Sequence, residues 1–298
     1  MSTKPRHKYE FSVDLTAPSA PTYVVRMVGH FKRVLEVGCG PGSVTKLLTQ
    51  HGQCRVTGLD LDSEAIDRVA PYCEAIVRGD LNSPEWPSLL DKVKPFDVVV
   101  AADVLEHLYD PWSVLAQMAG FIRPDGYLVI SLPHVGHAAV ASCLINGDFE
   151  YREWGLLDRT HIRFFGLKNI QDLFTQAGLK ILEAEYVVKT PEETEFAASW
   201  CRLSAAVQDA LKSSDYADIY QVVVKAVPIS HPGYAVSLVP PEPRHTAVGM
   251  RTLWKTRLAH HLSQSTRQRI RQGLSLLGIR LRSQQTPCLC SLPDSDWE

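Results

Sequence analysis

Short hydrophobic runs alternate with amphipathic segments along most of this chain. Seven runs have the length and composition of strands, and they lie at 33–37, 55–60, 74–79, 96–102, 127–133, 179–188 and 220–227. Between several of these runs, apolar residues recur at helical spacing, at 43–51, 63–70, 110–122 and 168–177. Strands that alternate with helices predict an α/β fold, in which helices cover both faces of a mostly parallel sheet.

Two local signals mark boundaries between these elements. Asp110 followed by Pro111 predicts the start of a helix, because proline at the first helical position needs no amide donor. The Arg-Pro-Asp-Gly sequence at 123–126 predicts a turn before the fifth strand. In sheets of this kind ligands bind beyond the carboxyl ends of the strands. Side chains that directly follow a strand are therefore the candidates for chemistry.

The first strand runs into a glycine-rich turn and carries an acid near its end. Gly38, Gly40 and Gly42 can adopt positive φ and have no Cβ, so a ligand can lie close to their backbone. Ser43 follows, so the third glycine of a dinucleotide fingerprint is missing. Glu36 would repel a pyrophosphate, whereas it would attract the ammonium group of an amino acid. The pattern therefore favours S-adenosylmethionine over NAD.

Acids also follow the next three predicted strands. Asp60 lies about 20 residues after the glycine turn, where a carboxylate can accept hydrogen bonds from both hydroxyls of a ribose. Asp80 follows the third strand, where an acceptor would meet the adenine amino group, and Asp103 follows the fourth. We expect these three acids, together with Leu61 and Leu81, to line the cofactor site.

The ordered motifs E-V-G-C-G-P-G, L-D-L-D, R-G-D and A-D-V-L-E-H-L resemble those of the class I S-adenosylmethionine-dependent methyltransferases. The resemblance covers residues 20–227. It implies a Rossmann-like seven-stranded methyltransferase sheet, mostly parallel, in which the seventh strand inserts antiparallel between the fifth and the sixth. It also implies that the cofactor is S-adenosylmethionine.

Candidate acceptor-side residues follow the fourth and fifth strands. Glu106 and His107 either face the transferred methyl group or orient the helix that begins there. His134 and His137 follow the fifth strand, and each either contacts the acceptor or bonds a nearby loop. We slightly favour His134 of these two.

A segment rich in aromatic and charged residues, 148–166, lies between the fifth strand and the helix near 168–177. An insertion at this point would cover the mouth of the pocket as a lid, and its candidates are Phe149, Tyr151, Trp154, Phe164, Phe165, Asp158, Arg159, His161 and Arg163. Its L-D-R-T-H-I-R-F-F run, together with residues 9–28, resembles methyltransferases found alone or fused to glycosyltransferases in bacterial polysaccharide and secondary-metabolite clusters.

The implied reaction is an in-line displacement at the sulfonium methyl group, for which a histidine base suits a hydroxyl acceptor at neutral pH. His161 is our first choice of base, with Asp158 to orient its imidazole and Arg159 to hold an anionic acceptor group. Alternatively, Asp158 forms a structural ion pair with Arg159 or Arg163, His161 is structural, or His134 is the base. The Asp and His residues show no metal-ligand spacing, so we expect a metal-free site.

Length and charge predict an appendage after the catalytic domain. The chain has 298 residues, of which 1–227 form the predicted domain, 228–250 a proline-rich linker and 251–298 a basic amphipathic extension. From residue 228 onward there are nine Lys and Arg residues but four Asp and Glu residues. Such a helix either packs on its own domain, lies on an anionic membrane surface or docks on a protein partner, and nucleic acid is disfavoured.

The composition indicates a cytoplasmic protein. Residues 1–10 are polar rather than a secretory signal, and no apolar run approaches the roughly 18 residues of a membrane span. The seven cysteines are scattered and odd in number, which favours reduced thiols.

Three classes of function fit these observations. The first is methyl transfer to a small-molecule or glycan acceptor, with a hydroxyl favoured and a carbon or nitrogen acceptor left open. The second is a non-catalytic regulatory or scaffold protein that keeps the cofactor site. The third is an NAD-linked oxidoreductase, which Glu36 and Ser43 disfavour.

Overall fold

The computed structural model describes residues 7–239, whose centre is a seven-stranded sheet. The strand order is β3-β2-β1-β4-β5-β7-β6. The strands are β1 (Arg33–Val37), β2 (Arg55–Asp60), β3 (Ala75–Arg78), β4 (Phe96–Ala102), β5 (Ile122–Pro133), β6 (Leu179–Val188) and β7 (Ile219–Pro228). Strand β7 is antiparallel to both of its neighbours, β5 and β6. The α/β prediction and the implied position of the seventh strand are therefore confirmed.

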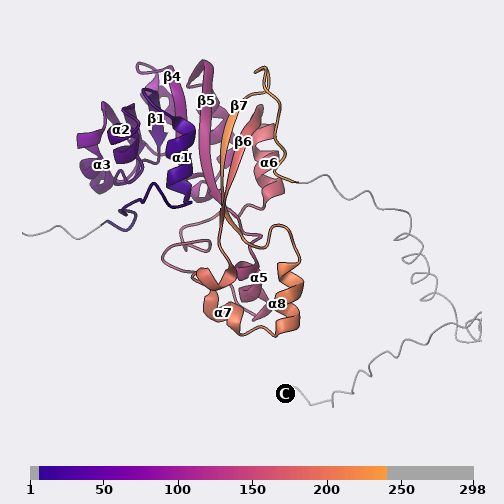
Figure 1. Ribbon diagram of the computed structural model, residues 1–298. Coiled ribbons are helices and arrows are strands. Elements are labelled where there is room, and N and C mark those ends of the chain that lie inside the picture. The colour runs from indigo at the N-terminus through magenta and orange to yellow at the C-terminus, as the bar shows by residue number, and fades with distance from the viewer. Residues whose placement is uncertain (1–6, 240–298) are drawn as a thin grey trace, which may run out of the picture. The chain divides into compact units, whose positions relative to one another are not determined.

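Helices cover both faces of the sheet (Figure 1). The α-helices are α1 (Ala20–Val28), α2 (Thr45–Gln50), α3 (Ser63–Val69), α4 (Pro111–Ala119), α5 (Ala138–Ile145), α6 (Leu167–Gln176), α7 (Ala197–Cys201) and α8 (Ala205–Lys212). Short 3-10 helices form η1 (Ala70–Tyr72), η2 (Trp86–Leu90), η3 (Leu105–His107) and η4 (Pro191–Glu193).

Alternation along the central strands produces two hydrophobic cores. In β4, Val98 and Val100 join the core that also contains residues of α1 and α2. Val99, between them, joins the opposite core, which contains residues of α4 and α6. Successive side chains of a strand point to opposite faces, so a continuously apolar strand feeds both cores. This explains why the buried strands read as unbroken hydrophobic runs.

Some predicted boundaries differ from the structure. Residues 123–126, expected to form a turn, lie inside β5, where the register with β4 shifts. The helix expected at 110–122 ends at Ala119. Helix α1 was not predicted as a helix, although Ser19 caps its N-terminus and accepts a hydrogen bond from the amide of Thr22.

A small helical layer lies beyond one end of the sheet and is built from two insertions (Figure 1). We call residues 138–164 and 189–218 the cap. The first insertion, between β5 and α6, contains α5 and the predicted lid except for residues 165–166. The second, between β6 and β7, contains η4, α7 and α8. A shared apolar cluster joins them, with Leu156 and Leu157 from the first and Phe196 from the second. The lid is thus part of a larger unit than the sequence indicated.

The beginning of the predicted linker packs against the catalytic domain. The amide of Val236 donates to the carbonyl of Ile181 at 2.8 Å. Leu238 is 3% exposed within the core that contains residues of α4 and α6, which we call the main core. The remainder of that linker and the predicted extension at 251–298 lie outside the described residues.

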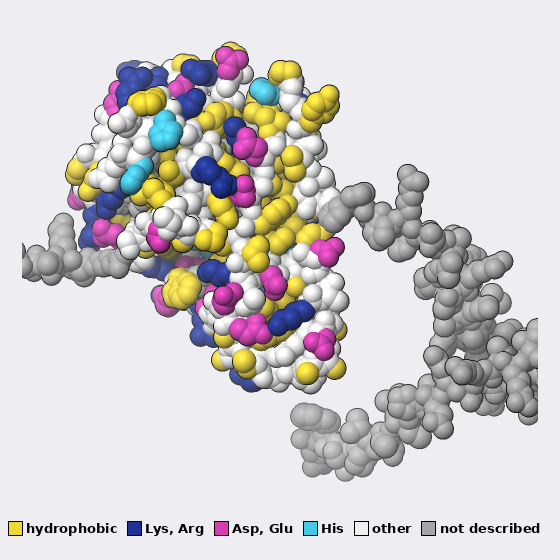
Figure 2. Space-filling view, viewed as in Figure 1, with side chains coloured by type: hydrophobic (Ala, Val, Ile, Leu, Met, Phe, Trp, Pro, Cys, Tyr) yellow, Lys and Arg dark blue, Asp and Glu magenta, His cyan; other side chains and the backbone are white. Residues whose placement is uncertain are grey.

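The described surface in Figure 2 carries basic and acidic side chains interspersed with hydrophobic ones. Within residues 7–239, the structure has no helix with the length and hydrophobicity needed to cross a membrane.

Candidate active site

The glycine turn after β1 has the open backbone expected of a ligand floor. Gly40 has φ 52°, and a Cβ placed on it would meet open space. Its amide donates to Oδ2 of Asp60 at 2.7 Å. At Gly38, with φ 65°, a Cβ would instead lie 2.6 Å from a methyl carbon of Val104. Gly38 is therefore required for packing, whereas Gly40 leaves room for a ligand.

Glu36 is a buried carboxyl beside this turn. It is 2% exposed, and its Oε2 accepts a 2.6 Å hydrogen bond from the hydroxyl of Thr45. Burial, together with a smaller effect of the nearby charge of Asp60, raises the pKa of Glu36 to about 7. An ammonium group bound here would offset the cost of ionising this carboxyl.

Asp60 and Asp80 lie at the carboxyl ends of their strands, as predicted. Oδ1 of Asp60 accepts from the amide of Asp62 at 2.9 Å, so backbone donors hold both of its oxygens in place. Oδ1 of Asp80 accepts from the amide of Asn82. Of the two leucines in this set, Leu61 is 55% exposed whereas Leu81 is buried.

Asp103, directly after β4, adopts an unusual backbone conformation. Its φ is 53°, a region that non-glycine residues seldom occupy and that carries strain. Its Oδ1 accepts from the hydroxyl of Ser131 at 2.7 Å, and its Oδ2 accepts from the side-chain amide of Gln221 at 2.9 Å. The carboxylate therefore joins the ends of β4, β5 and β7.

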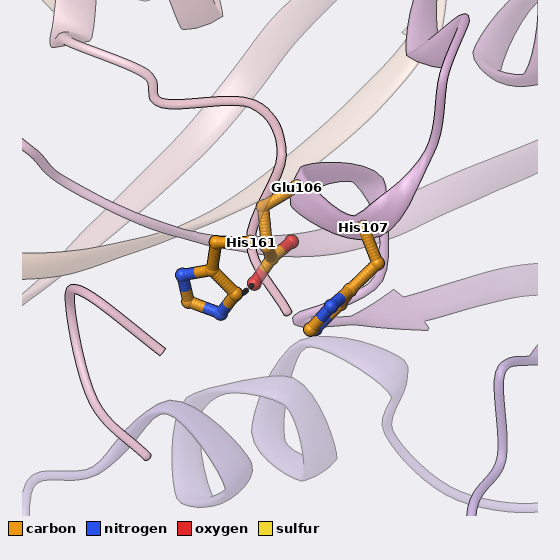
Figure 3. A group of neighbouring side chains, drawn as sticks. All are labelled: Glu106, His107 and His161. Carbon is orange, nitrogen blue, oxygen red and sulfur yellow. Dashed lines mark ion pairs between the residues drawn. The ribbon is translucent and has the colours of Figure 1, made fainter. Parts of the chain in front are cut away.

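Glu106, His107 and His161 form a compact cluster at the same edge of the sheet (Figure 3). Glu106 and His107 project from η3, and His161 comes from the first insertion of the cap. One potential ligand atom from each residue lies within 4.8 Å of the other two. The Glu106 carboxylate points toward the His161 ring, with 3.9 Å between Oε1 and Nε2. His161 lies 55 positions after Glu106 in the chain, so spacing in the sequence did not reveal this group.

Burial dominates the electrostatics of this cluster. It raises the pKa of Glu106 well above its ordinary value, and the charge of Asp103 raises it further. Burial lowers the pKa of His107, and it lowers the pKa of His161 to about 4, with His107 adding to the effect. Both imidazoles are therefore neutral near pH 7.

Asp158 does not orient the imidazole of His161 through its side chain. Its carboxylate, 3% exposed, accepts hydrogen bonds from Nζ of Lys8 and from Thr160. Burial opposes the charged form, but the hydrogen bonds of Thr160 and Lys8 keep the pKa of Asp158 below its ordinary value. The His161 ring instead bonds the carbonyl of Leu156 through Nδ1, at 3.2 Å.

The two predicted arginines have other partners. Arg159 pairs with Glu153 at 3.0 Å, and both side chains are exposed. Arg163 donates to the carbonyl of Tyr109 and lies over the ring of Trp112. The ion pair expected between Asp158 and an arginine is thus formed with Lys8.

His134 and His137 are bonded to the backbone around the cap. Nδ1 of His134 lies 3.0 Å from the carbonyl of Ile219. Nδ1 of His137 accepts from the amide of Ala139 and caps α5, while its Nε2 donates to the carbonyl of Lys189 at 2.8 Å. These bonds match the structural alternative for both histidines.

Sequence reasoning did not predict the contacts of residues 7–11, which we call the N-terminal segment. It joins the glycine turn to the cap, since Ser43 Oγ accepts from the amide of Phe11 and donates to the carbonyl of Tyr9, while Lys8 reaches Asp158. Thr45, the partner of Glu36, was also missed. A threonine nine residues after the acid carries no recognisable signal, because their contact depends on how α2 packs against β1.

Residues 18–184 match the family described as "Methyltransferase domain". This match covers more than half of the chain, which therefore belongs to this family and is a class I S-adenosylmethionine-dependent methyltransferase. The family membership also assigns S-adenosylmethionine, rather than NAD, as the cofactor.

Curated relatives are distant. The chain is 24% identical over 166 residues to the "Ubiquinone biosynthesis O-methyltransferase" of Coxiella burnetii (strain RSA 493 / Nine Mile phase I), a match that covers 55% of this chain and 70% of that protein. It is 25% identical to the protein of the same name from Shewanella halifaxensis, over 58% of this chain and 75% of the relative. Among solved structures, a putative methyltransferase from Bacillus halodurans has a TM-score of 0.49 at 15% identity, covering 69% of this chain and 97% of that one.

Proposed function

We propose that this methyltransferase transfers the methyl group of S-adenosylmethionine to a hydroxyl oxygen of a small molecule or glycan. The observation that carries the proposal is the cluster of Glu106, His107 and His161 at the sheet edge that also holds the cofactor acids. Neutral imidazole nitrogens and a carboxyl are suited to binding a polar oxygen. The names of the distant relatives, which are O-methyltransferases, support the same acceptor atom.

For the cofactor, we propose roles that follow the strand ends. Glu36 binds the ammonium group, Asp60 the ribose hydroxyls, and Asp80 the adenine amino group. Gly38, Gly40 and Gly42 form the floor, and Leu61 and Leu81 contact the adenine ring. Asp103, held by Ser131 and Gln221, lines the cofactor site at the end of β4.

In the reaction, the acceptor oxygen forms a bond to the methyl carbon as the carbon–sulfur bond breaks. The sulfur keeps the electron pair and becomes the thioether of S-adenosylhomocysteine, and the acceptor proton passes to solvent. The protein's task is to hold the oxygen near 3 Å from the methyl carbon and to exclude water. With a pKa of about 4, His161 is a weak base for a hydroxyl. We therefore assign it to positioning the oxygen rather than to removing the proton.

The acceptor class rests on the cap. Its aromatic residues Tyr151 and Trp154 are 59% and 61% exposed, and exposed rings beside charged groups suit a sugar or a phenolic acceptor. The resemblance of the 157–165 run to methyltransferases of polysaccharide and secondary-metabolite clusters favours the same classes. We propose that Arg159 and Arg163 contribute to the acceptor side, and that His134, His137 and Asp158 maintain the cap.

The first experiment is calorimetric titration with S-adenosylmethionine, S-adenosylhomocysteine and NAD. We expect micromolar binding of the first two and none of NAD. Radiolabelled methyl transfer to panels of phenols, sugars, amines and carbon acceptors then tests the acceptor, with His161→Ala as the site variant and exposed His51→Ala as its control. We expect His161→Ala to lose turnover while keeping its cofactor affinity. Methylation confined to carbon or nitrogen acceptors would overturn the proposal.

A further inference from the structure

Hydrogen bonds fix the tautomers of both cluster histidines. Nδ1 of His107 lies 3.1 Å from the carbonyl of Thr160, and Nδ1 of His161 lies 3.2 Å from the carbonyl of Leu156. A carbonyl oxygen only accepts hydrogen bonds, so each Nδ1 must carry the proton. In a neutral ring, Nε2 is then left with a lone pair.

The carboxyl oxygens of Glu106 add lone pairs close to those of the two imidazoles. Its side chain is fully buried, and neither carboxyl oxygen has a hydrogen-bond partner among residues 7–239. The 3.9 Å to Nε2 of His161 is too long for a hydrogen bond. A buried carboxyl without a partner is costly. The three side chains thus direct lone pairs toward one point, an arrangement suited to binding a donor or a cation.

We propose that Glu106, His107 and His161 together bind one divalent transition-metal ion. Two imidazole nitrogens and one carboxylate oxygen are a donor set that zinc and iron use in sites with open coordination positions. Carbonyl acceptors on the far nitrogens are the supports that metal-bound histidines usually have. Ligand atoms around a tetrahedral ion lie about 3.4 Å apart, so an ion would draw these side chains inward from their spread of up to 4.8 Å.

The neighbouring carboxylates do not complete the set. Asp103 is held by Ser131 and Gln221, and Asp158 by Lys8 and Thr160. With three protein ligands, the ion keeps open positions that water or an oxygen of the acceptor can occupy. The spacing along the sequence led us to expect no metal, whereas the fold assembles a donor set from η3 and the cap.

The direct test is Co²⁺ binding to the tag-free, full-length protein, followed by visible absorption. We expect the wild type to bind one more equivalent than Glu106→Gln, or to bind that equivalent at least about tenfold more tightly, since even supporting residues of metal sites contribute that much. His51→Ala, an exposed histidine variant, should match the wild type. Equal binding by wild type and Glu106→Gln would overturn the proposal, as would a wild type that binds no Co²⁺ at micromolar concentrations.

A second measurement needs no variant. X-ray absorption of the Zn²⁺-loaded wild type should show nitrogen and oxygen neighbours with the multiple scattering of two imidazoles. Sulfur neighbours would place the ion on cysteines and overturn the site. If the Glu106→Gln variant no longer binds S-adenosylmethionine, we treat it as misfolded. The X-ray absorption spectrum of the wild type then decides. Neither measurement involves methyl transfer, so failure of the metal site is distinguishable from failure of the proposed function.

Discussion

At the scale of single residues, an ionised Glu36 lowers the stability of the fold but favours binding of a cationic ligand. Its folded pKa of about 7 lies above the ordinary 4.5, so the folded state holds this proton more tightly than the unfolded state. The free energy of unfolding therefore falls as the pH rises from about 4.5 to 7 and stays lower above it, by about 3 kcal/mol for this group. The cofactor's ammonium group would recover part of that energy when it binds.

Glu36→Gln should reduce the loss of stability at high pH and weaken binding of S-adenosylmethionine. A glutamine keeps an oxygen for Thr45 but cannot ionise, so we expect its stability to fall less between pH 5 and pH 8 than that of the wild type. Its affinity for S-adenosylmethionine should fall by about 1.5 to 3 kcal/mol, the contribution of a charged hydrogen bond. Urea unfolding at both pH values and calorimetry measure the two effects. Parallel pH profiles for wild type and variant would contradict the first, and exposed Glu85→Gln serves as the control.

Residue-level predictions succeeded where they rested on position along a strand. The strand-end acids Asp60, Asp80 and Asp103 all lie at the carboxyl edge, because the alternation of strands and helices dictates it. Partners were harder to predict. Lys8 reaches Asp158 across 150 positions, and the His161 ring bonds a backbone carbonyl, and neither contact leaves a pattern in the sequence.

At the scale of elements, the N-terminal segment is held to the cap by the pair of Lys8 and Asp158. Lys8→Met should lower the free energy of unfolding by about 1 to 2 kcal/mol, because a buried carboxylate loses a donor but keeps Thr160. The double variant with Asp158→Asn should lose less than the sum of the single variants. Urea unfolding of all four proteins completes the cycle, and additive losses would show that the pair contributes nothing. Exposed Lys92→Met is the charge control.

Leu238 extends the domain beyond its predicted end. We expect Leu238→Ala to lower the free energy of unfolding by about 2 to 4 kcal/mol, because it removes a side chain that is 3% exposed in the main core. Val236→Ala, two residues earlier and 38% exposed, should cost less than about 1 kcal/mol. Chemical denaturation compares them, and similar losses would mean that this stretch is not anchored through Leu238.

The predicted end at residue 227 was too early because proline content was taken as the sign of a linker. Prolines exclude helix but do not exclude packing, and an extended chain can still place Leu238 in a core. Likewise, residues 123–126 were predicted to form a turn because of their Pro-Asp-Gly sequence. In the structure β4 pairs with β5 on both sides of these residues, and the register of the pairing shifts between the two sides. Tertiary pairing overrode both local signals.

At the scale of the whole molecule, the cap is a small core that depends on both insertions. Trp200, fully buried, packs with Ala138 of α5 and Ala217, and its indole donates to Glu192. Trp200→Ala should loosen the cap and lower turnover at least about tenfold, while the affinity for S-adenosylmethionine changes less than about threefold, because a small misplacement of the acceptor suffices to slow transfer.

Steady-state kinetics and calorimetry on the same preparation separate these effects. Trp154→Ala is an unsuitable control because its ring lies on the proposed acceptor side, so exposed Tyr234→Ala is used. A parallel loss of cofactor affinity in Trp200→Ala would show that the cap and the sheet are not independent.

The sequence predicted the sheet but only half of the cap. The second insertion, 189–218, contains the short helices α7 and α8. Their apolar patterns are too short to predict helices from the sequence. Residues 148–166 were predicted to form a lid because they are dense in aromatic and charged residues, and Phe165 among them is part of the main core.

Both insertions branch from one edge of the sheet: the first leaves after the end of β5 and continues into α6, and the second connects the end of β6 to the start of β7. In the function proposed above, the sheet holds the cofactor and the cap selects the acceptor. Because residues of both stretches share one apolar cluster, we expect that transferring acceptor preference between such enzymes requires the exchange of both stretches at once. Exchanging one stretch alone would leave its apolar residues without the partners that they contact in the other stretch.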